Sequence, residues 1–252
     1  EDIAGFHPSV VVISGDLTQR ARKKQFEAAR AFIRKIPVPC LVVPGNHDIP
    51  LYDVVRRALM PLRRYRHYIT TDLNPVFQDD ELLILGANTS RAATFKNGRI
   101  STAQIKILAD KFSAAGSHLF KVLVTHHPFL PPLDYPYAAL VGRGVLAVEA
   151  LEPCGIDLLL SGHYHRGFMG DLQSHYVAVG RSIIVAQAGT ATSKRTRGEK
   201  NSYDRIIIGL PDICFDRYAW DGRRFAKALT TQYKKVNGAW QLHHPQNIHE
   251  TR

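Results

Sequence analysis

Four short clusters of polar residues in this sequence combine side chains that bind metal ions. They are Ser14-Gly15-Asp16, Gly45-Asn46-His47-Asp48, His126-His127-Pro128 and Ser161-Gly162-His163-Tyr164-His165. Carboxylate, amide and imidazole groups together suit Mn, Fe, Zn or Ni better than Ca. A carboxylate such as Asp16 can bridge two cations, which a neutral imidazole cannot do. The chemistry that these residue types indicate is therefore that of a metal centre.

Each cluster directly follows a short apolar run that predicts a buried β-strand. In open α/β sheets ligands bind beyond the carboxyl ends of the strands, so four such clusters are expected to meet at one place. His163 and His165 lie two residues apart, and on an extended segment both can face one side. The first run is too apolar on both faces for an edge strand. The four runs are 10–14, 40–43, 121–125 and 156–160.

The elements around these strands predict βαβ units first and a mostly antiparallel region after residue 171. Apolar residues at helical spacing predict a helix over 22–36, which Pro37 and Pro39 end. Ser101 and Gln104 form a capping box that begins another helix. Further expected elements are a helix at 51–60, strands within 67–86, a long loop at 131–144, strands at 176–179, 182–186, 205–210 and 214–220, and a mobile end that carries His243, His244 and His249.

The amino-acid composition limits the classes of protein to which this chain can belong. The chain has 252 residues with 33 Lys+Arg against 22 Asp+Glu, a formal charge of +11, and 45 % hydrophobic residues. This is ordinary globular composition, which excludes a disordered tail, a collagen-like fibre and a coiled coil. No apolar run approaches the roughly 18 residues of a membrane span. Three cysteines at no metal-ligand spacing favour a reducing compartment, and we expect a cytoplasmic protein.

The four motifs, in this order, resemble those of the calcineurin-like metallophosphoesterase superfamily. Within it, Ser14-Gly-Asp-Leu-Thr18 and Val43-Pro-Gly-Asn-His-Asp48 look like the bacterial cyclic-nucleotide phosphodiesterase (class III) type. The resemblance spans residues 8 to about 210. It implies one α/β domain over residues 1–252, an αββα sandwich of two mixed sheets flanked by helices.

The resemblance also implies a role for each matching residue. His47 would not bind metal but would stand over the substrate phosphate as proton donor or charge stabiliser, oriented by Asp48. The implied reaction is in-line attack on phosphorus by a metal-bridging hydroxide, with two cations clamping the attacking and leaving oxygens. The ions would be divalent or mixed-valence Mn, Fe or Zn, held by Asp16 between both, by Asn46, His126 and His163 at the second site, and by His165 at the first.

One motif of the family is missing. The first motif, Asp-x-His, supplies two ligands of the first metal site, and no Asp-x-His occurs in this chain. We expect the strand that bears it to precede Glu1, which would make the domain over residues 1–252 N-terminally truncated. Within these residues the first site keeps only Asp16 and His165. We therefore expect this polypeptide alone to hold the second metal better than the first and to hydrolyse poorly.

The leading prediction is a metal-dependent phosphohydrolase, a phosphodiesterase that acts on small or cyclic-nucleotide-like diesters. One alternative is a DNA nuclease of the same fold, for which the charge of +11 is the only argument. Another is a catalytically silent module that binds a partner protein, against which the intact metal motifs and His47 argue. Arg195 and Arg197 offer bidentate phosphate contacts, although a solvated loop is the alternative.

Overall fold

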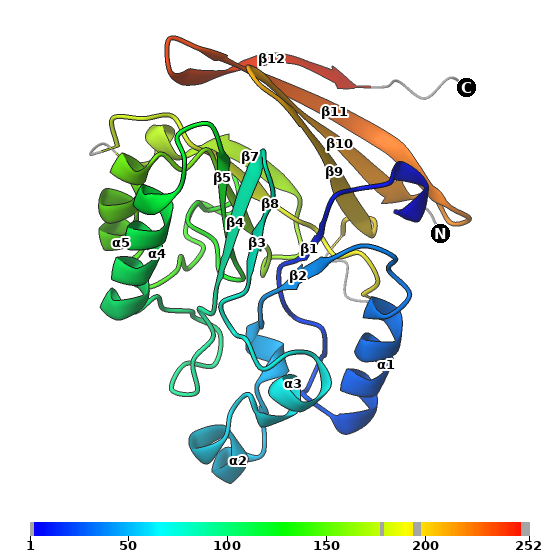
Figure 1. The fold of residues 1–252 in the computed structure, drawn as a ribbon. Coiled ribbons are helices and arrows are strands. Elements are labelled where there is room, and N and C mark those ends of the chain that lie inside the picture. Colours follow the sequence, from blue (N-terminus) through cyan, green and yellow to red (C-terminus); the bar gives the residue numbers. More distant parts are fainter. Residues whose placement is uncertain (1–2, 177–178, 194–197, 248–252) are drawn as a thin grey trace.

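The computed structural model describes residues 3–176, 179–193 and 198–247. Its largest sheet has six strands in the order β3-β4-β5-β6-β8-β7, of which β4, β5, β6 and β8 are parallel and the two outer strands antiparallel (Figure 1). These strands are β3 (Val76–Gln78), β4 (Leu82–Ala87), β5 (Phe120–Thr125), β6 (Leu158–Ser161), β7 (Phe168–Asp171) and β8 (Ile184–Gln187). Two shorter arrays complete the β-structure. One is the parallel pair β1 (Val11–Ile13) and β2 (Cys40–Val42), and the other is the antiparallel array β9 (Ser202–Gly209), β10 (Asp212–Trp220), β11 (Phe225–Val236) and β12 (Ala239–Asn247).

Alternation along the central strands sends apolar side chains to both faces of the six-stranded sheet. Leu123 and Leu159 pack with the helices α4 (Thr102–Ala114) and α5 (Gly144–Leu151) on one face. Their neighbours Val122 and Leu158 face the opposite way and pack with residues of β10, β11 and β12. The β1–β2 pair belongs to this second layer, and its outer face is covered by α1 (Lys23–Ile33) and α3 (Arg63–Tyr68). The order of layers is therefore helix, sheet, sheet, helix, as predicted.

The remaining elements are short. α2 (Val54–Leu59) leaves most of its apolar side chains exposed. Single 3-10 turns are η1 (Ala4–Phe6), η2 (Asn46–Asp48), η3 (Glu152–Cys154) and η4 (Leu172–Ser174). None of the helices in the described ranges combines the length and apolarity that crossing a bilayer requires.

Several predicted elements are corrected by the structure. The run 10–14 gives a strand at the edge of a two-stranded sheet, half-buried throughout, rather than a buried interior strand. Residues 67 and 68 close helix α3, because Leu62, Tyr65 and Tyr68 recur at helical spacing and Tyr65 is fully buried. The supposed mobile end is instead the hairpin β11–β12, which contains His243 and His244; His249 lies outside the described residues.

The predicted strand at 176–179 and the predicted helix over 22–36 differ from the structure. No strand is found at Tyr176 or Val179, and the two residues between them lie outside the described part of the chain. Helix α1 stops at Ile33, three residues before the predicted end. The capping box at Ser101 is present, since its side chain accepts the N–H of Gln104 while the Gln104 side chain accepts the N–H of Ser101. The predicted loop 131–144 contains neither helix nor strand up to residue 143, apart from an isolated bridge between Gly142 and Arg99, and its last residue begins helix α5.

Candidate metal centre

The four polar clusters follow the carboxyl ends of four strands. Asp16 lies just after β1, the turn η2 carries Asn46–Asp48 after β2, His126 follows β5, and His163 follows β6. Parallel pairing of β1 with β2, and of β5 with β6, puts these ends on the same side of each sheet. The two sheets face each other, so the four loops meet in one region between them.

The backbone of this region is bent into unusual conformations. Gly15 has φ +89°, and a Cβ there would lie 2.7 Å from both Gly45 N and His126 Nδ1. Asp16, His163 and His165 also have positive φ, at 54°, 78° and 60°. A left-handed conformation costs a non-glycine residue about 1–2 kcal/mol. Such strain clusters where a side chain must be aimed at a functional site.

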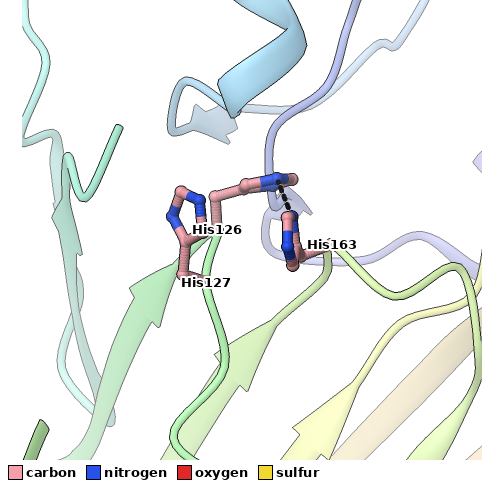
Figure 2. Close-up of side chains that lie close together, drawn as sticks. All are labelled: His126, His127 and His163. Carbon is pink, nitrogen blue, oxygen red and sulfur yellow. Dashed lines mark hydrogen bonds between the residues drawn. The ribbon is translucent and has the colours of Figure 1, made fainter. Parts of the chain in front are cut away.

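Acceptor atoms from separate loops converge at this place. The Oδ1 atom of Asn46 lies 3.1 Å from His126 Nε2 and 3.0 Å from His163 Nδ1. The two histidines are themselves joined across 3.2 Å (Figure 2). Asp16 Oδ1 lies 3.4 Å from His126 Nε2. Segments more than a hundred residues apart in the chain therefore place four ligand atoms within contact distance.

Proton positions follow from the outer partners of these side chains. His126 Nδ1 lies 2.7 Å from the carbonyl of Ser14, which can only accept, so Nδ1 carries the proton and Nε2 offers a lone pair. Asn46 donates its amide N–H to the carbonyl of Phe95, which turns Oδ1 toward the centre. With neutral imidazoles, at most one of the four converging atoms, His163 Nδ1, carries a proton.

This donor set fits a cation. Metal–nitrogen bonds of about 2.1 Å place adjacent ligands about 3 Å apart, and the measured separations run from 3.0 to 3.4 Å. Asp16 Oδ2 is buried and has no hydrogen-bond partner among the described residues. A buried carboxylate oxygen without a partner is costly unless a positive charge lies beside it. Asp16, Asn46, His126 and His163 can therefore hold one metal ion.

His127 lies beside this group but is already occupied. Ligand atoms of His126, His127 and His163 lie within 4.8 Å of one another. Both ring nitrogens of His127 have partners, because Nε2 donates to the carbonyl of Lys96 at 3.0 Å and Nδ1 accepts from the hydroxyl of Thr89 at 2.7 Å. Burial, and then the neighbouring imidazoles, hold the pKa of His127 well below its usual range. In Figure 2 the ring of His127 turns away from the contact between the other two. We therefore leave His127 out of the ligand set.

His47 is half-exposed and is held from two sides. Its backbone N–H donates to Asp16 Oδ1 at 2.9 Å, and its ring Nδ1 donates to the carbonyl of Gln19 at 2.9 Å. The protonated Nδ1 leaves Nε2 as the ring atom that can exchange a proton. The ring lines the same cavity as Asp16 and His163.

Asp48 is completely buried and joins two loops. Its carboxylate accepts the backbone N–H groups of Gly45 and Thr18, both at 2.9 Å, and that of Leu17 at 3.3 Å. Burial, and then the negative charge of Asp16, raise the pKa of Asp48 to about 7 against these three N–H groups. Asp48 therefore positions the backbone on both sides of the centre, since these hydrogen bonds go to backbone rather than to the His47 ring.

The other predicted site residues are placed less directly. His165 lines the cavity that Asp16, His47 and His163 line. Arg195 and Arg197 lie outside the described residues. Sequence reasoning missed the segment 91–99, whose carbonyl groups at Phe95 and Lys96 hold Asn46 and His127. Backbone carbonyls leave no signature in residue type, so no sequence signal could have found them.

Comparison with known proteins identifies the family. The model of the calcineurin-like phosphoesterase family matches residues 1–167. Over 162 residues the chain is 28 % identical to "Glycerophosphodiester phosphodiesterase GpdQ" from Enterobacter lignolyticus (strain SCF1), an alignment that covers 63 % of this chain and 56 % of that protein. The chain thus spans just over half the length of this curated relative.

A solved structure shows the same fold. A dimetal phosphatase from Danio rerio superposes with a TM-score of 0.62 at 11 % identity, covering 86 % of this chain and 83 % of that chain. A weaker likeness, to phosphopantetheinyl hydrolase from Mycobacterium tuberculosis, has a TM-score of 0.44 at 14 % identity and covers 71 % and 79 %. The family match extends over about two thirds of the sequence, from residue 1 to residue 167 of 252. The chain is therefore a member of the calcineurin-like phosphoesterase family, as its motifs predicted.

Proposed function

We propose that this chain is a metal-dependent phosphodiesterase that hydrolyses small phosphodiesters of the glycerophosphodiester or cyclic-nucleotide kind. The observation that carries the proposal is the convergence of ligand atoms from Asp16, Asn46, His126 and His163, among which at most one proton can lie. Membership of a phosphoesterase family supports hydrolysis with divalent metal ions. The relative described as a glycerophosphodiester phosphodiesterase favours a diester over a monoester.

The four converging side chains would hold the ion of the second site, and Asp16 would share the ion of the first site with His165. When bound, the ions supply positive charge that stabilises phosphate oxygens and lowers the pKa of a water molecule. Residues 1–252 offer only Asp16 and His165 as motif ligands for the first site. We therefore propose that this chain alone retains one ion tightly and the other weakly, with slow hydrolysis.

His47 would act on the substrate rather than on metal. The carbonyl of Gln19 fixes the ring, and the contact of its backbone with Asp16 fixes its distance from the centre. In the imidazolium form of the ring, Nε2–H can give a proton to the leaving oxygen or donate a hydrogen bond to the phosphate. Asp48 would be a positioning residue, because it acts through the backbone of the two loops that it joins.

Some of the basic residues are used inside the fold, which weakens the argument from net charge for a nucleic-acid substrate. Arg57 is buried and donates to three backbone carbonyls, and Lys121 is buried and does the same. Arg217 is paired with Asp204 at 2.7 Å. These charges stabilise the fold and are not available to phosphates of a duplex, so the net charge alone does not define a nucleic-acid groove.

The test measures hydrolysis of bis-p-nitrophenyl phosphate with Mn²⁺ in the His47→Ala variant, with metal content measured by elemental analysis. We expect a loss of about 100-fold or more in kcat with metal content unchanged. His67→Ala is the matched control, since His67 is an exposed histidine on α3. Unchanged activity in His47→Ala, or the same loss in both variants, contradicts the proposed role. Two tightly bound ions per chain contradict the proposed weakness of one site.

A further inference from the structure

Helix α2 exposes its apolar side and buries a charged side chain, the reverse of an ordinary surface helix. Positions 54, 55, 58 and 59 share one side of the helix, because residues three and four apart lie on the same face. All four side chains are exposed, whereas that of Arg57, on the opposite side, is buried. A surface helix normally turns its apolar stripe toward the core. The four exposed residues are Val54, Val55, Ala58 and Leu59.

The contacts of Arg57 fix α2 in this orientation. Its guanidinium donates to the carbonyls of Pro50, Ala92 and Thr94, at 3.0, 2.7 and 2.6 Å. The central carbon of the guanidinium also lies 4.3 Å from the centre of the Phe95 ring. A buried guanidinium without partners is costly, so α2 cannot turn its valines inward without breaking these bonds. The exposure of the apolar side is therefore built into the fold.

Residues on either side of α2 extend the exposed apolar surface. Tyr52 precedes the helix cap Asp53, Met60 ends the helix, and Phe95 lies against Arg57. Together with the helix they present six large apolar side chains, each between 46 % and 72 % exposed. A large apolar patch of this kind on a folded chain marks an interaction site. We call this surface the α2 patch, and it consists of Tyr52, Val54, Val55, Leu59, Met60 and Phe95.

The chain around the α2 patch is strongly basic. Residues 49–70 contain five arginines and one acidic residue, and residues 91–99 contain three basic residues and no acidic one. Arg63 donates its backbone N–H to the carbonyl of Met60, and Lys96 directly follows the phenylalanine of the patch. Both basic side chains are exposed, so they form a cationic rim. Apolar side chains beside a cationic rim are typical of segments that lie in the headgroup region of an anionic bilayer.

We propose that the α2 patch docks this protein on the surface of a bilayer that contains anionic phospholipid. Its apolar side chains would enter the headgroup region while the basic rim contacts lipid phosphates. Figure 1 shows α2 at the lower end of the molecule, away from the β-sheets, where a flat surface can approach it. The patch adjoins the metal centre, because the carbonyl of Phe95 accepts the Asn46 amide at 3.3 Å. The proposal concerns binding alone and stands whether or not the proposed hydrolysis is found.

Charge favours a bilayer over a second copy of the chain. In a symmetric dimer the same patch on two copies would face itself, and the two basic rims would repel each other. An anionic bilayer presents the opposite charge to the rim. Nucleic acid would also attract the rim, but its phosphates would leave Val54, Val55 and Leu59 in water.

The first test is flotation of residues 1–252 with lipid vesicles. A chelator is present, so that metal at the centre cannot hold lipid phosphate. We expect binding to vesicles that mix phosphatidylcholine with phosphatidylglycerol, and binding weaker by about tenfold or more to phosphatidylcholine alone. Added salt should weaken the binding to the mixed vesicles. Failure to float with the mixed vesicles at low salt, or equal binding to both kinds, overturns the proposal.

Val55→Asp tests whether the α2 patch makes the contact. Val145→Asp is the matched control, because each valine is the second residue of its helix and more than half exposed. Val55→Asp should reduce binding to the mixed vesicles by about tenfold or more, and Val145→Asp should not. Both variants should keep the wild-type Tm, since each change is at an exposed position. Equal binding by the two variants contradicts the assignment to α2.

A second pair of variants tests the basic rim. Lys96→Gln should weaken binding to the mixed vesicles by about fivefold, whereas Lys111→Gln, at an exposed lysine of α4, should have little effect. Equal effects of the two changes would mean that overall charge, rather than the rim, attracts the vesicles, and would overturn the proposed contact. Self-association that Val55→Asp abolishes, without vesicle binding, identifies a second copy as the occupant and also overturns it.

Discussion

The adjacent histidines His126 and His127 offer a sharp test of the metal centre. Both side chains are 1 % exposed, so replacing either by alanine removes the same ring from a buried position. They differ only in what their ring nitrogens contact. His126 Nε2 faces Asn46 and His163, whereas both nitrogens of His127 bond to groups of the surrounding structure. The two variants should therefore lose different properties.

The stability effects can be worked out from these contacts. His127→Ala removes the acceptor of the Thr89 hydroxyl proton and the donor to the Lys96 carbonyl, and each such loss costs about 1–3 kcal/mol. A total of about 3 kcal/mol corresponds to a fall in Tm of about 6–12 °C for a domain of this size. His126→Ala loses the bond to the carbonyl of Ser14 and the contact with His163, and it separates crowded acceptor atoms, so its cost should be nearer to about 1 kcal/mol.

The effects on metal binding should run in the opposite order. His126→Ala removes one of the four proposed ligands and should weaken Mn²⁺ binding by more than about 100-fold, whereas His127→Ala should weaken it by about tenfold or less. Thermal unfolding with a chelator present measures the stability of each variant. Equilibrium dialysis against Mn²⁺ measures its affinity for metal. If His127→Ala weakens binding more than His126→Ala, His126 is not the ligand and His127 has been wrongly left out of the set.

Three further predictions concern the centre and the antiparallel sheet. Gly45→Ala should weaken Mn²⁺ binding in dialysis by about tenfold or more, since its Cβ would lie 2.1 Å from Asp16 Oδ1, whereas Gly209→Ala, with open space around it, should not. Removing metal with a chelator should lower Tm, because an ion that binds the folded chain at 100 times its Kd adds about 2.7 kcal/mol, and a Tm that does not respond to Mn²⁺ contradicts this. Asp216→Asn should cost about 2 kcal/mol in urea unfolding at pH 7, because the buried carboxylate accepts from Thr230 and from Lys227 at 2.9 Å. Burial acts to raise the pKa of Asp216, but these bonds outweigh it and hold the pKa below its usual value. The stability that the Asp216 carboxylate contributes is therefore fully present above about pH 4, the pKa of an unfolded aspartate, and is lost as the pH falls through the lower pKa of the folded state. The difference between wild type and Asp216→Asn should therefore vanish in acid.

The metal motifs could be predicted from sequence because each is short and directly follows a strand whose apolar run is easy to recognise. The central strands β5 and β6 were found for the same reason, since they are buried on both faces. The hairpin β11–β12 was missed because its alternation is weak. Of its apolar residues with described side chains, Tyr233 and Trp240 are the ones buried, and Lys234 and Lys235 lie between them. Its position is decided by packing against the six-stranded sheet, which a local pattern does not contain.

The edge position of β1 could not be predicted, because pairing is a property of the whole sheet rather than of one segment. The same position bears on the metal centre. Asp16 follows β1, which is held by a three-residue ladder to β2, by the bond from His126 to Ser14, and by the contacts of Asp48 with residues 17 and 18. A metal ion held by Asp16 would restrict the motion of the same segment. Binding of metal and ordering of β1 are therefore expected to favour each other.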